Sequence, residues 1–206
     1  MAATECPEIE LAGRGRAYGN SARTLRADAW RSASAQTAAM AVHPRWAEDF
    51  EALRRGDGCP MCASLGQDEN PHGVRFLAGR WGDAYFGRRP VRPGYAYVIW
   101  NGRHVAEPTE LTPEELTGFW ADVTLAARAI EARFQPLKMN WMALGNSVPH
   151  LHVHLVPRYE SDPSAGGPIE ATAFDIEATP PLDDATMAAE VAALRAAVSA
   201  GDGERA

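Results

Sequence analysis

Three histidines stand at alternate positions in one short stretch, Gly145 to Arg158, which reads GNSVPHLHVHLVPR. They are His150, His152 and His154, half of the six histidines in the chain. Side chains two residues apart on a β-strand point to the same side, so the imidazoles should share one face while the intervening aliphatic residues face the core. Pro157 should end this strand, because proline has no N–H to donate to a ladder.

This histidine cluster has three explanations. The imidazoles could share a metal ion, they could act as acid, base or nucleophile, or they could be partly exposed without a role. Crowded imidazoles repel one another when protonated, and each needs hydrogen-bond partners, which argues against an idle cluster. The pattern therefore indicates chemistry on one side of the strand.

A second group of reactive residues is the C-x-x-C of Cys59 and Cys62, in the turn-rich segment GDGCPMC. Two thiolates of such a knuckle are commonly completed by two imidazoles to give the four ligands that zinc takes. The candidates for these imidazoles are His104 and His150, with His43 and His72 as competitors. The alternatives are a pair of buried small residues or a redox pair, which would be expected after a strand and at the start of a helix.

Asn146 and Ser147 form a turn directly before the histidines. Short polar side chains and backbone amides of such a turn could contact phosphate oxygens, or they could serve the turn alone. The loop Arg88 to Gly94 is rich in arginine and glycine but is not a P-loop, because it lacks the G-x-x-x-x-G-K-[ST] pattern.

Other patterns predict the elements that position these residues. Trp46, Phe50 and Leu53 have helical spacing, which Gly56 should end. Strands are predicted at 74–78, 81–87, 95–100 and 138–144, with the last pairing with the histidine strand across the turn at 145–147. An Ala-rich amphipathic helix is predicted over 183–198.

The sequence Thr112-Pro113-Glu114-Glu115 forms a capping box with proline at the first helical position, so a helix should start there. Apolar residues then recur at intervals of three and four as far as Pro136: Leu116, Phe119, Trp120, Val123, Ala127, Ile130 and Phe134. This single apolar stripe predicts a long helix that lies on a sheet.

Length and composition limit the class of protein. A chain of 206 residues favours one domain with extensions, here 1–42 as a poorly ordered extension, 43–160 as the domain and 161–206 as a loop and helix. Met40, where aromatic residues return, is a candidate start. A net charge of -7 argues against nucleic acid as a partner, and no apolar run is long enough for a membrane span. Without a signal sequence, a cytoplasmic location is expected.

The run His150 to Val156 resembles the His-φ-His-φ-His-φ-φ signature of the histidine-triad (HIT) superfamily, where φ is apolar. The lead-in GNSVP, the CPMC knuckle and the segment NGRHV resemble the zinc-containing branch in order and spacing. The resemblance covers Cys59 to Arg158. It implies an α+β fold with an antiparallel sheet of about five strands, one long helix across it, and a homodimer.

The same resemblance implies roles for individual residues. His152 would be the nucleophile that attacks the α-phosphorus of a nucleotide and carries a transient nucleotidyl group. His154 and Ser147 would contact the phosphate or the leaving group, and Asn146 would help to orient it. A structural zinc would be bound by Cys59, Cys62, His104 and His150. The family often has histidine where Tyr95 stands, and an acidic residue where Arg88 and Arg89 stand.

Three functions remain open from the sequence. The first is a nucleotide hydrolase or nucleotidyltransferase acting on phosphoramidates, dinucleoside polyphosphates or nucleotide sugars through His152. The second is a nucleotide-binding or regulatory module without turnover that keeps the structural zinc. The third is a metallohydrolase with its ion on all three triad histidines.

Overall fold

The computed structural model describes residues 46–162, 166–169 and 179–202. The expected N-terminal extension, and with it Cys6, Met40 and His43, lies outside the described residues. These described residues belong to one compact unit.

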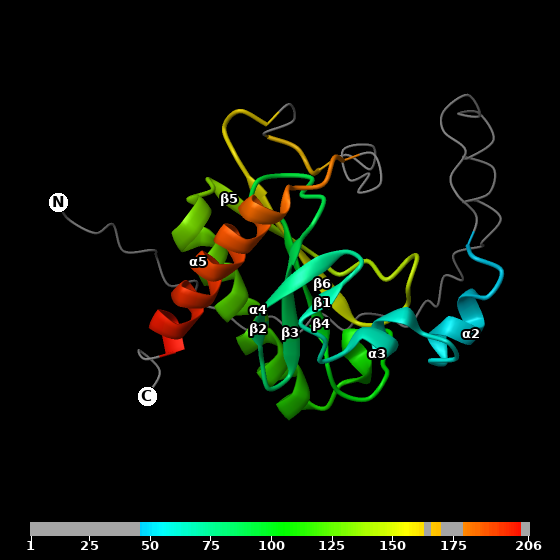
Figure 1. Ribbon diagram of the computed structural model, residues 1–206. Coiled ribbons are helices and arrows are strands. Elements are labelled where there is room, and N and C mark those ends of the chain that lie inside the picture. Colours follow the sequence, from blue (N-terminus) through cyan, green and yellow to red (C-terminus); the bar gives the residue numbers. More distant parts are fainter. Residues whose placement is uncertain (1–45, 163–165, 170–178, 203–206) are drawn as a thin grey trace, which may run out of the picture. The chain divides into compact units, whose positions relative to one another are not determined.

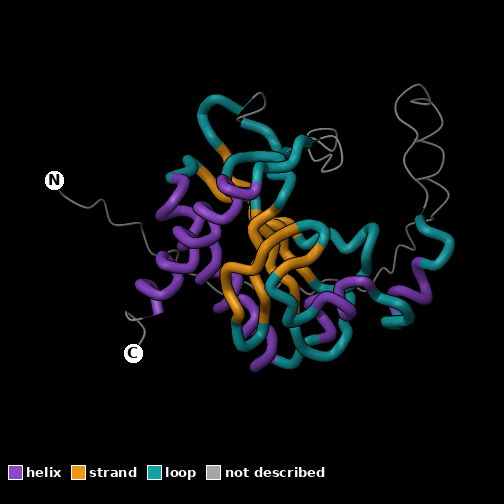
Figure 2. The backbone as a smooth tube through the Cα atoms, in the orientation of Figure 1, coloured by secondary structure: helices purple, strands orange, loops and turns teal. Residues whose placement is uncertain are grey.

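Among the described residues, six antiparallel strands form one sheet in the order β1-β2-β3-β4-β6-β5. Figure 2 shows the strands in orange. They are β1 (Glu69–Asn70), β2 (Gly73–Ala78), β3 (Gly82–Gly87), β4 (Ala96–Trp100), β5 (Lys138–Met142) and β6 (His152–Arg158). The predicted α+β class is confirmed, with six strands where about five were expected. The additional strand β1 is two residues long, too short to show any periodicity in the sequence.

One face of the sheet is covered by the long helix α4 (Pro113–Phe134). Its capping box is formed as predicted: Thr112 Oγ1 accepts from the N–H of Glu115 at 3.3 Å, and Glu115 Oε2 accepts from the N–H of Thr112 at 2.8 Å. Phe119, Val123 and Ile130 of the apolar stripe are buried in the core beneath the helix.

The C-terminal helix α5 (Asp184–Asp202) packs against α4 and β2, and Figure 1 shows it alongside α4. Met187, Val191 and Leu194 recur at helical spacing and are buried in the same core. Asp183 precedes the helix, and its carboxylate accepts from the N–H of Thr186 at 2.9 Å. The predicted C-terminal helix is therefore confirmed.

Two short helices precede the sheet, α2 (Phe50–Arg54) and α3 (Pro60–Ser64). Met61 of α3 and the adjacent Leu65 pack against a second apolar cluster on the sheet face opposite α4, formed by Tyr85, Val91, Tyr95, Tyr97, Ile99 and Val156. The helix predicted from Trp46 begins only at Phe50, and Trp46 is 64% exposed. Trp46 therefore adds little burial that would extend the helix.

The side chains of strand β6 alternate between the two faces of the sheet. Val153 and Leu155 are buried in the core beneath α4, whereas His152 and His154 point to the opposite face. The prediction that all three histidines lie in one strand is wrong for His150. It precedes β6, and its N–H donates to the carbonyl of Val148 at 2.8 Å in a tight turn.

Pro157 lies inside β6 and does not end it, contrary to the prediction. The carbonyl of Arg158 accepts from the N–H of Leu137 at 2.9 Å, so Arg158 directs its backbone polar groups toward the β5 side. The nitrogen of Pro157 then points to the β4 side, beyond the last pair of that ladder, Ala96 with Leu155. The missing N–H therefore costs no ladder hydrogen bond.

Candidate active site and metal cluster

Four side chains with metal-ligating atoms converge at one end of the sheet, and these atoms all lie within 4.8 Å of one another. They are Cys59, Cys62, His104 and His150, the set that the resemblance implied. Cys59 caps the N-terminus of α3 and Cys62 lies in its first turn. His104 follows β4, and His150 precedes β6, so the pairing of these two strands brings both histidines to the helix.

The distances between the donor atoms suit a single tetrahedral ion. Cys62 Sγ lies 3.3 Å from His104 Nδ1 and 3.4 Å from His150 Nδ1, and Cys59 Sγ lies 3.6 Å from His150 Nδ1. In tetrahedral zinc sites with Zn–S of about 2.3 Å and Zn–N of about 2.0 Å, sulfur and nitrogen lie about 3.5 Å apart. The four residues therefore fit zinc both in chemistry and in spacing.

Backbone carbonyls hold both imidazoles in the form that a metal requires. His150 Nε2 donates to the carbonyl of Trp100 at 2.8 Å, and His104 Nε2 donates to the carbonyl of Arg54 at 3.2 Å. Because a carbonyl oxygen only accepts, we assign the proton to Nε2 in each ring. In the neutral rings, both Nδ1 lone pairs face the thiols, as in metal sites whose ligands are oriented by outer hydrogen bonds.

The electrostatics of the cluster suit a divalent cation. Burial, followed by the neighbouring Cys59, raises the pKa of the Cys62 thiol to about 11. Burial lowers the pKa of His150, which favours the neutral imidazole. Two thiols and two neutral imidazoles would bind a cation with release of the thiol protons.

His152 and His154 form a contacting pair on the face opposite α4. Their Nε2 atoms are 3.1 Å apart, and their rings meet at 80°. Burial lowers the pKa of His152, and burial together with His152 lowers the pKa of His154 to about 3. Both rings are therefore neutral near pH 7, and each carries one N–H.

The protons on this pair follow from the hydrogen bonds. His152 Nδ1 lies 2.6 Å from the carbonyl oxygen of His150, so its one proton is on Nδ1 and its Nε2 is a bare acceptor. The proton between the two Nε2 atoms must then belong to His154. The Nδ1 of His154 is consequently an acceptor, and it lies 2.9 Å from the hydroxyl of Tyr95, which donates to it.

This arrangement can support covalent catalysis. The lone pair of His152 Nε2 points away from the backbone carbonyl that holds the ring. It accepts a hydrogen bond from the Nε2–H of His154, and that N–H could instead donate to another acceptor. A neutral, fixed imidazole is a competent nucleophile near pH 7. The N–H of His154 would be available to an oxygen of a bound phosphate.

Asn146 and Ser147 lie in the loop between β5 and β6, and both are exposed. Within the part of the chain that the structure describes, neither side chain forms a hydrogen bond with a triad histidine. Gly145 has a φ of 63°, which supports the sharp turn before them. Their expected contacts with phosphate remain a prediction.

The other candidates from the sequence lie elsewhere. His72 is exposed in the turn between β1 and β2, outside the cluster, and His43 lies outside the described residues. Cys59 and Cys62 are not joined in a disulfide bond. Sequence reasoning assigned no role to Tyr95 or to the carbonyls of Arg54 and Trp100. The one sequence signal for Tyr95 was its departure from the family at that position. The two carbonyls gave no signal, because a backbone acceptor does not depend on residue type.

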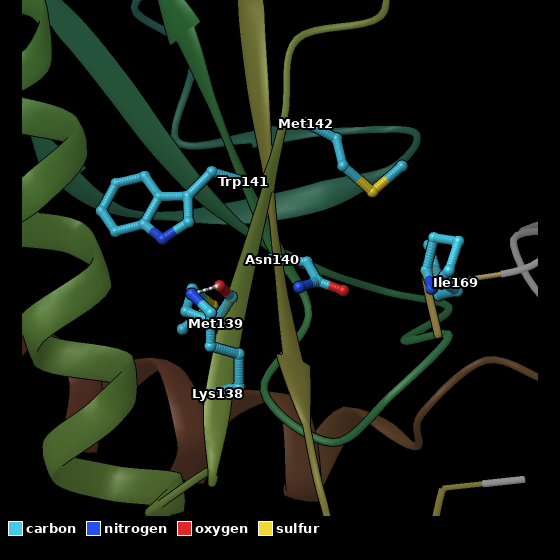
Figure 3. A pocket seen from close by; sticks show the side chains of 7 residues that line it. Lys138, Met139, Asn140, Trp141, Met142 and Ile169 are labelled. Carbon is cyan, nitrogen blue, oxygen red and sulfur yellow. Dashed lines mark hydrogen bonds between the residues drawn. The ribbon is translucent and has the colours of Figure 1, made fainter. Parts of the chain in front are cut away.

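A separate pocket of about 370 Å³ lies along the edge strand β5, lined by Lys138, Met139, Asn140, Trp141, Met142, Pro168 and Ile169. Figure 3 shows Trp141 directed toward α4, with Asn140 and Met142 on the other side of β5, facing Ile169. Beside it, the buried Arg158 donates to Asn140 at 2.8 Å and to Asp162 at 2.6 Å. These contacts fasten the chain after β6 to the edge of the sheet.

Comparison with known proteins identifies relatives over part of the chain. The chain is 34% identical over 92 residues to a bis(5'-nucleosyl)-tetraphosphatase (asymmetrical) of Schizosaccharomyces pombe, a match that covers 42% of this chain and 50% of that protein. It is 28% identical over 91 residues to bis(5'-adenosyl)-triphosphatase of Saccharomyces cerevisiae, covering 41% and 44%. The chain thus spans about half the length of the curated relatives it matches.

Solved structures share the fold. A histidine triad protein from Bradyrhizobium japonicum has a TM-score of 0.54 at 19% identity and covers 62% of this chain and 91% of its own. A zinc-bound histidine triad family protein from Mycobacterium smegmatis has a TM-score of 0.52 at 23% identity, covering 71% and 96%. The family model described as HIT domain matches residues 84–161, which include β4, α4 and the three histidines. Residues 84–161 of the chain are therefore similar to HIT domains in sequence, and the chain shares their fold.

Proposed function

We propose that this chain is a nucleotide hydrolase or nucleotidyltransferase that acts at the α-phosphate through His152. The observation that carries the proposal is the bare Nε2 of His152, in a ring whose Nδ1 donates to the carbonyl of His150 at 2.6 Å. This hydrogen bond fixes both the ring and its tautomer, so no deprotonation is needed before attack. His152 is buried, which protects an intermediate on the ring from solvent.

The reaction would run in two displacements. The lone pair of His152 Nε2 attacks the α-phosphorus, the leaving group departs, and a nucleotidyl group remains on the ring. Water or another acceptor then releases the nucleotide. His154 would donate its Nε2–H to a phosphate oxygen, and Ser147 and Asn146, in the loop before β6, would bind the phosphate or the leaving group.

Dinucleoside polyphosphates are the first substrates to test. The two curated relatives are named as a dinucleoside tetraphosphatase and a dinucleoside triphosphatase, and their similarity extends over about 90 residues of this chain. We propose the same class of substrate here, together with nucleoside phosphoramidates.

The cluster of Cys59, Cys62, His104 and His150 would hold a structural zinc. Its four protein donors leave no open position for substrate, as in structural rather than catalytic zinc sites. When bound, the ion would cross-link α3, the end of β4 and the start of β6. Through His150 it would steady the carbonyl that orients His152.

We also propose a homodimer. Trp120 of α4 and Trp141 of the edge strand β5 are 36% and 37% exposed, and their rings lie 6.0 Å apart. Paired exposed tryptophans beside an unpaired strand edge favour association. Among the described helices, none is long and apolar enough to cross a membrane.

The test is incubation with diadenosine tetraphosphate and with an adenosine phosphoramidate, comparing the native chain with His152→Ala. We expect turnover that the substitution reduces by more than about 100-fold. Quenching with an alkaline denaturant, in which a P–N bond to imidazole survives, during turnover of a substrate labelled at the α-phosphate should trap label on the protein, and only on the native chain. Binding of a nucleoside monophosphate without turnover of either substrate would instead support a non-catalytic module.

A further inference from the structure

We infer that Tyr95 fixes His154 as a donor that keeps its proton. On the proposed function, the site then favours nucleotides whose leaving group departs without being protonated, dinucleoside polyphosphates over phosphoramidates. Tyr95 is a positioning residue here, because its hydroxyl touches His154 and not the reacting phosphorus.

The contact between Tyr95 and His154 is built into the fold. The hydroxyl lies 2.9 Å from His154 Nδ1, and the two rings stack with their centroids 6.1 Å apart at 16°. Tyr95 is 2% exposed. A Cβ atom at Gly87 would lie only 2.6 Å from Cδ1 of the Tyr95 ring, so strand β3 leaves room for the ring by carrying glycine there.

The direction of the hydrogen bond determines what His154 can do. The carbonyl of His150 fixes the proton of His152 on Nδ1, which leaves the proton of His154 on Nε2 and makes Tyr95 the donor. To release the Nε2 proton without becoming an anion, His154 would have to receive one at Nδ1. Burial raises the pKa of Tyr95 far above its ordinary value, so the phenol holds its proton. His154 therefore donates a hydrogen bond from Nε2 to the leaving group but does not transfer its proton to it.

The balance of the chemical step then separates two substrate classes. When His152 attacks a dinucleoside polyphosphate, the new P–N bond forms and the P–O bond to the bridging oxygen breaks. The electron pair stays on that oxygen as a phosphate oxyanion, which is stable at neutral pH and needs only a hydrogen bond. In the second step water attacks phosphorus, the P–N electron pair returns to His152 Nε2, and the proton of water passes to solvent.

A phosphoramidate differs in that its leaving group must be protonated. Its P–N bond must break with departure of an amine, and an amide anion is far too basic to leave, so the nitrogen has to gain a proton in the transition state. His154 cannot supply that proton, because Tyr95 does not replace it at Nδ1. A histidine there could accept and return protons near neutral pH, and so could resupply His154.

The kinetic test compares diadenosine tetraphosphate with an adenosine phosphoramidate as substrates of four chains. We expect the native chain to favour the tetraphosphate by about 100-fold or more in kcat/KM. Tyr95→His should raise phosphoramidate turnover and narrow this preference at least about tenfold, while Tyr95→Phe should lower tetraphosphate turnover about tenfold through loss of one hydrogen bond. Tyr97→Phe is the matched control, since its hydroxyl donates to Asn70 and not to the triad.

A second readout does not depend on turnover. Imidazole ¹⁵N shifts should show His154 as the Nε2–H tautomer in the native chain and in Tyr97→Phe, and in Tyr95→Phe the Nδ1 resonance of His154 should move because that nitrogen loses the hydrogen bond from the phenol. An unchanged Nδ1 shift of His154 in Tyr95→Phe, or equal native turnover of both substrates, would overturn the inference. If neither substrate turns over, the proposed function and the substrate preference fail together, and the ¹⁵N shifts still decide whether Tyr95 positions His154.

Discussion

The Nδ1–H of His152 donates to the carbonyl oxygen of His150 at 2.6 Å, while the side chain of His150 lies among the cysteines. One residue thus belongs to the candidate metal cluster through its ring and contacts the His152–His154 pair through its backbone. A shift of His150 would move the acceptor that defines the tautomer of His152.

This link predicts that loss of metal reduces turnover. The purified chain should contain about one zinc per molecule, and Cys62→Ser should lose most of it, because three donors and a hydroxyl bind zinc poorly. Elemental analysis measures the content, and turnover in the same preparations should fall with it. The control is His72→Ala, an exposed histidine outside the cluster, which should keep full zinc. Full zinc in Cys62→Ser would show that the cluster is not the binding site.

The buried His154 predicts a loss of stability in mild acid. Its pKa is lowered from 6.5 to about 3, so between these values the unfolded chain binds a proton that the folded chain does not. The stability that this group contributes is complete above pH 6.5 and is lost as the pH falls toward 3. We expect about 2 kcal/mol of this loss between pH 7 and pH 5.

Urea denaturation of the native chain and of His154→Gln at both pH values isolates that contribution. The free energy of unfolding should fall less in the variant on going from pH 7 to pH 5. An equal fall in both chains would mean that His154 is not held neutral.

The capping box of α4 predicts a moderate effect on stability alone. Thr112→Ala removes the acceptor for the N–H of Glu115 and should cost about 1 kcal/mol in urea denaturation, with zinc content unchanged. Thr117 provides the matched control, because its hydroxyl donates to the carbonyl of Pro113 within the helix. Thr117→Ala should change the free energy of unfolding by less than about 0.5 kcal/mol.

The carboxylate of Asp162 predicts a larger effect. It accepts from Arg158 at 2.6 Å and from Arg92 at 3.0 Å, and the side chains of Asp162 and Arg158 are 5% and 4% exposed. Asp162→Asn removes the carboxylate that pairs with the buried guanidinium of Arg158 and with Arg92, and should cost about 3 kcal/mol. Asp57→Asn, in an exposed pair with Arg55, should cost less than about 0.5 kcal/mol. Similar values for the two variants would contradict this account.

Local patterns predicted most of the fold. The alternation around His152 and the capping box at Thr112 act within a few residues, so β6 and α4 were predictable from their own sequence. The continuation of β6 through Pro157 was not, because it depends on β4 pairing no further than Leu155. Strand β1 likewise exists only through its pairing with β2.

The site was less predictable, because its contacts join distant segments. Spacing alone left four histidines as partners of the cysteines, and the pairing of β4 with β6 is what brings His104 and His150 together. The hydrogen bond from Tyr95 to His154 needs the placement of two rings from different strands, which no residue pattern encodes. The resemblance to the family, rather than spacing, selected the four residues in advance.

The position of Cys59 in the chain has a consequence for folding. It lies 91 residues from His150. A metal bound to both would close a long loop and lower the entropy of the unfolded chain, as a cross-link does. All four ligands come together only after β4 and β6 have paired, because this pairing brings His104 and His150 to the cysteines. We therefore expect the metal to be fully coordinated late in folding. Removal of the ion should then release α3 before the sheet, and uncover the aromatic face beneath it.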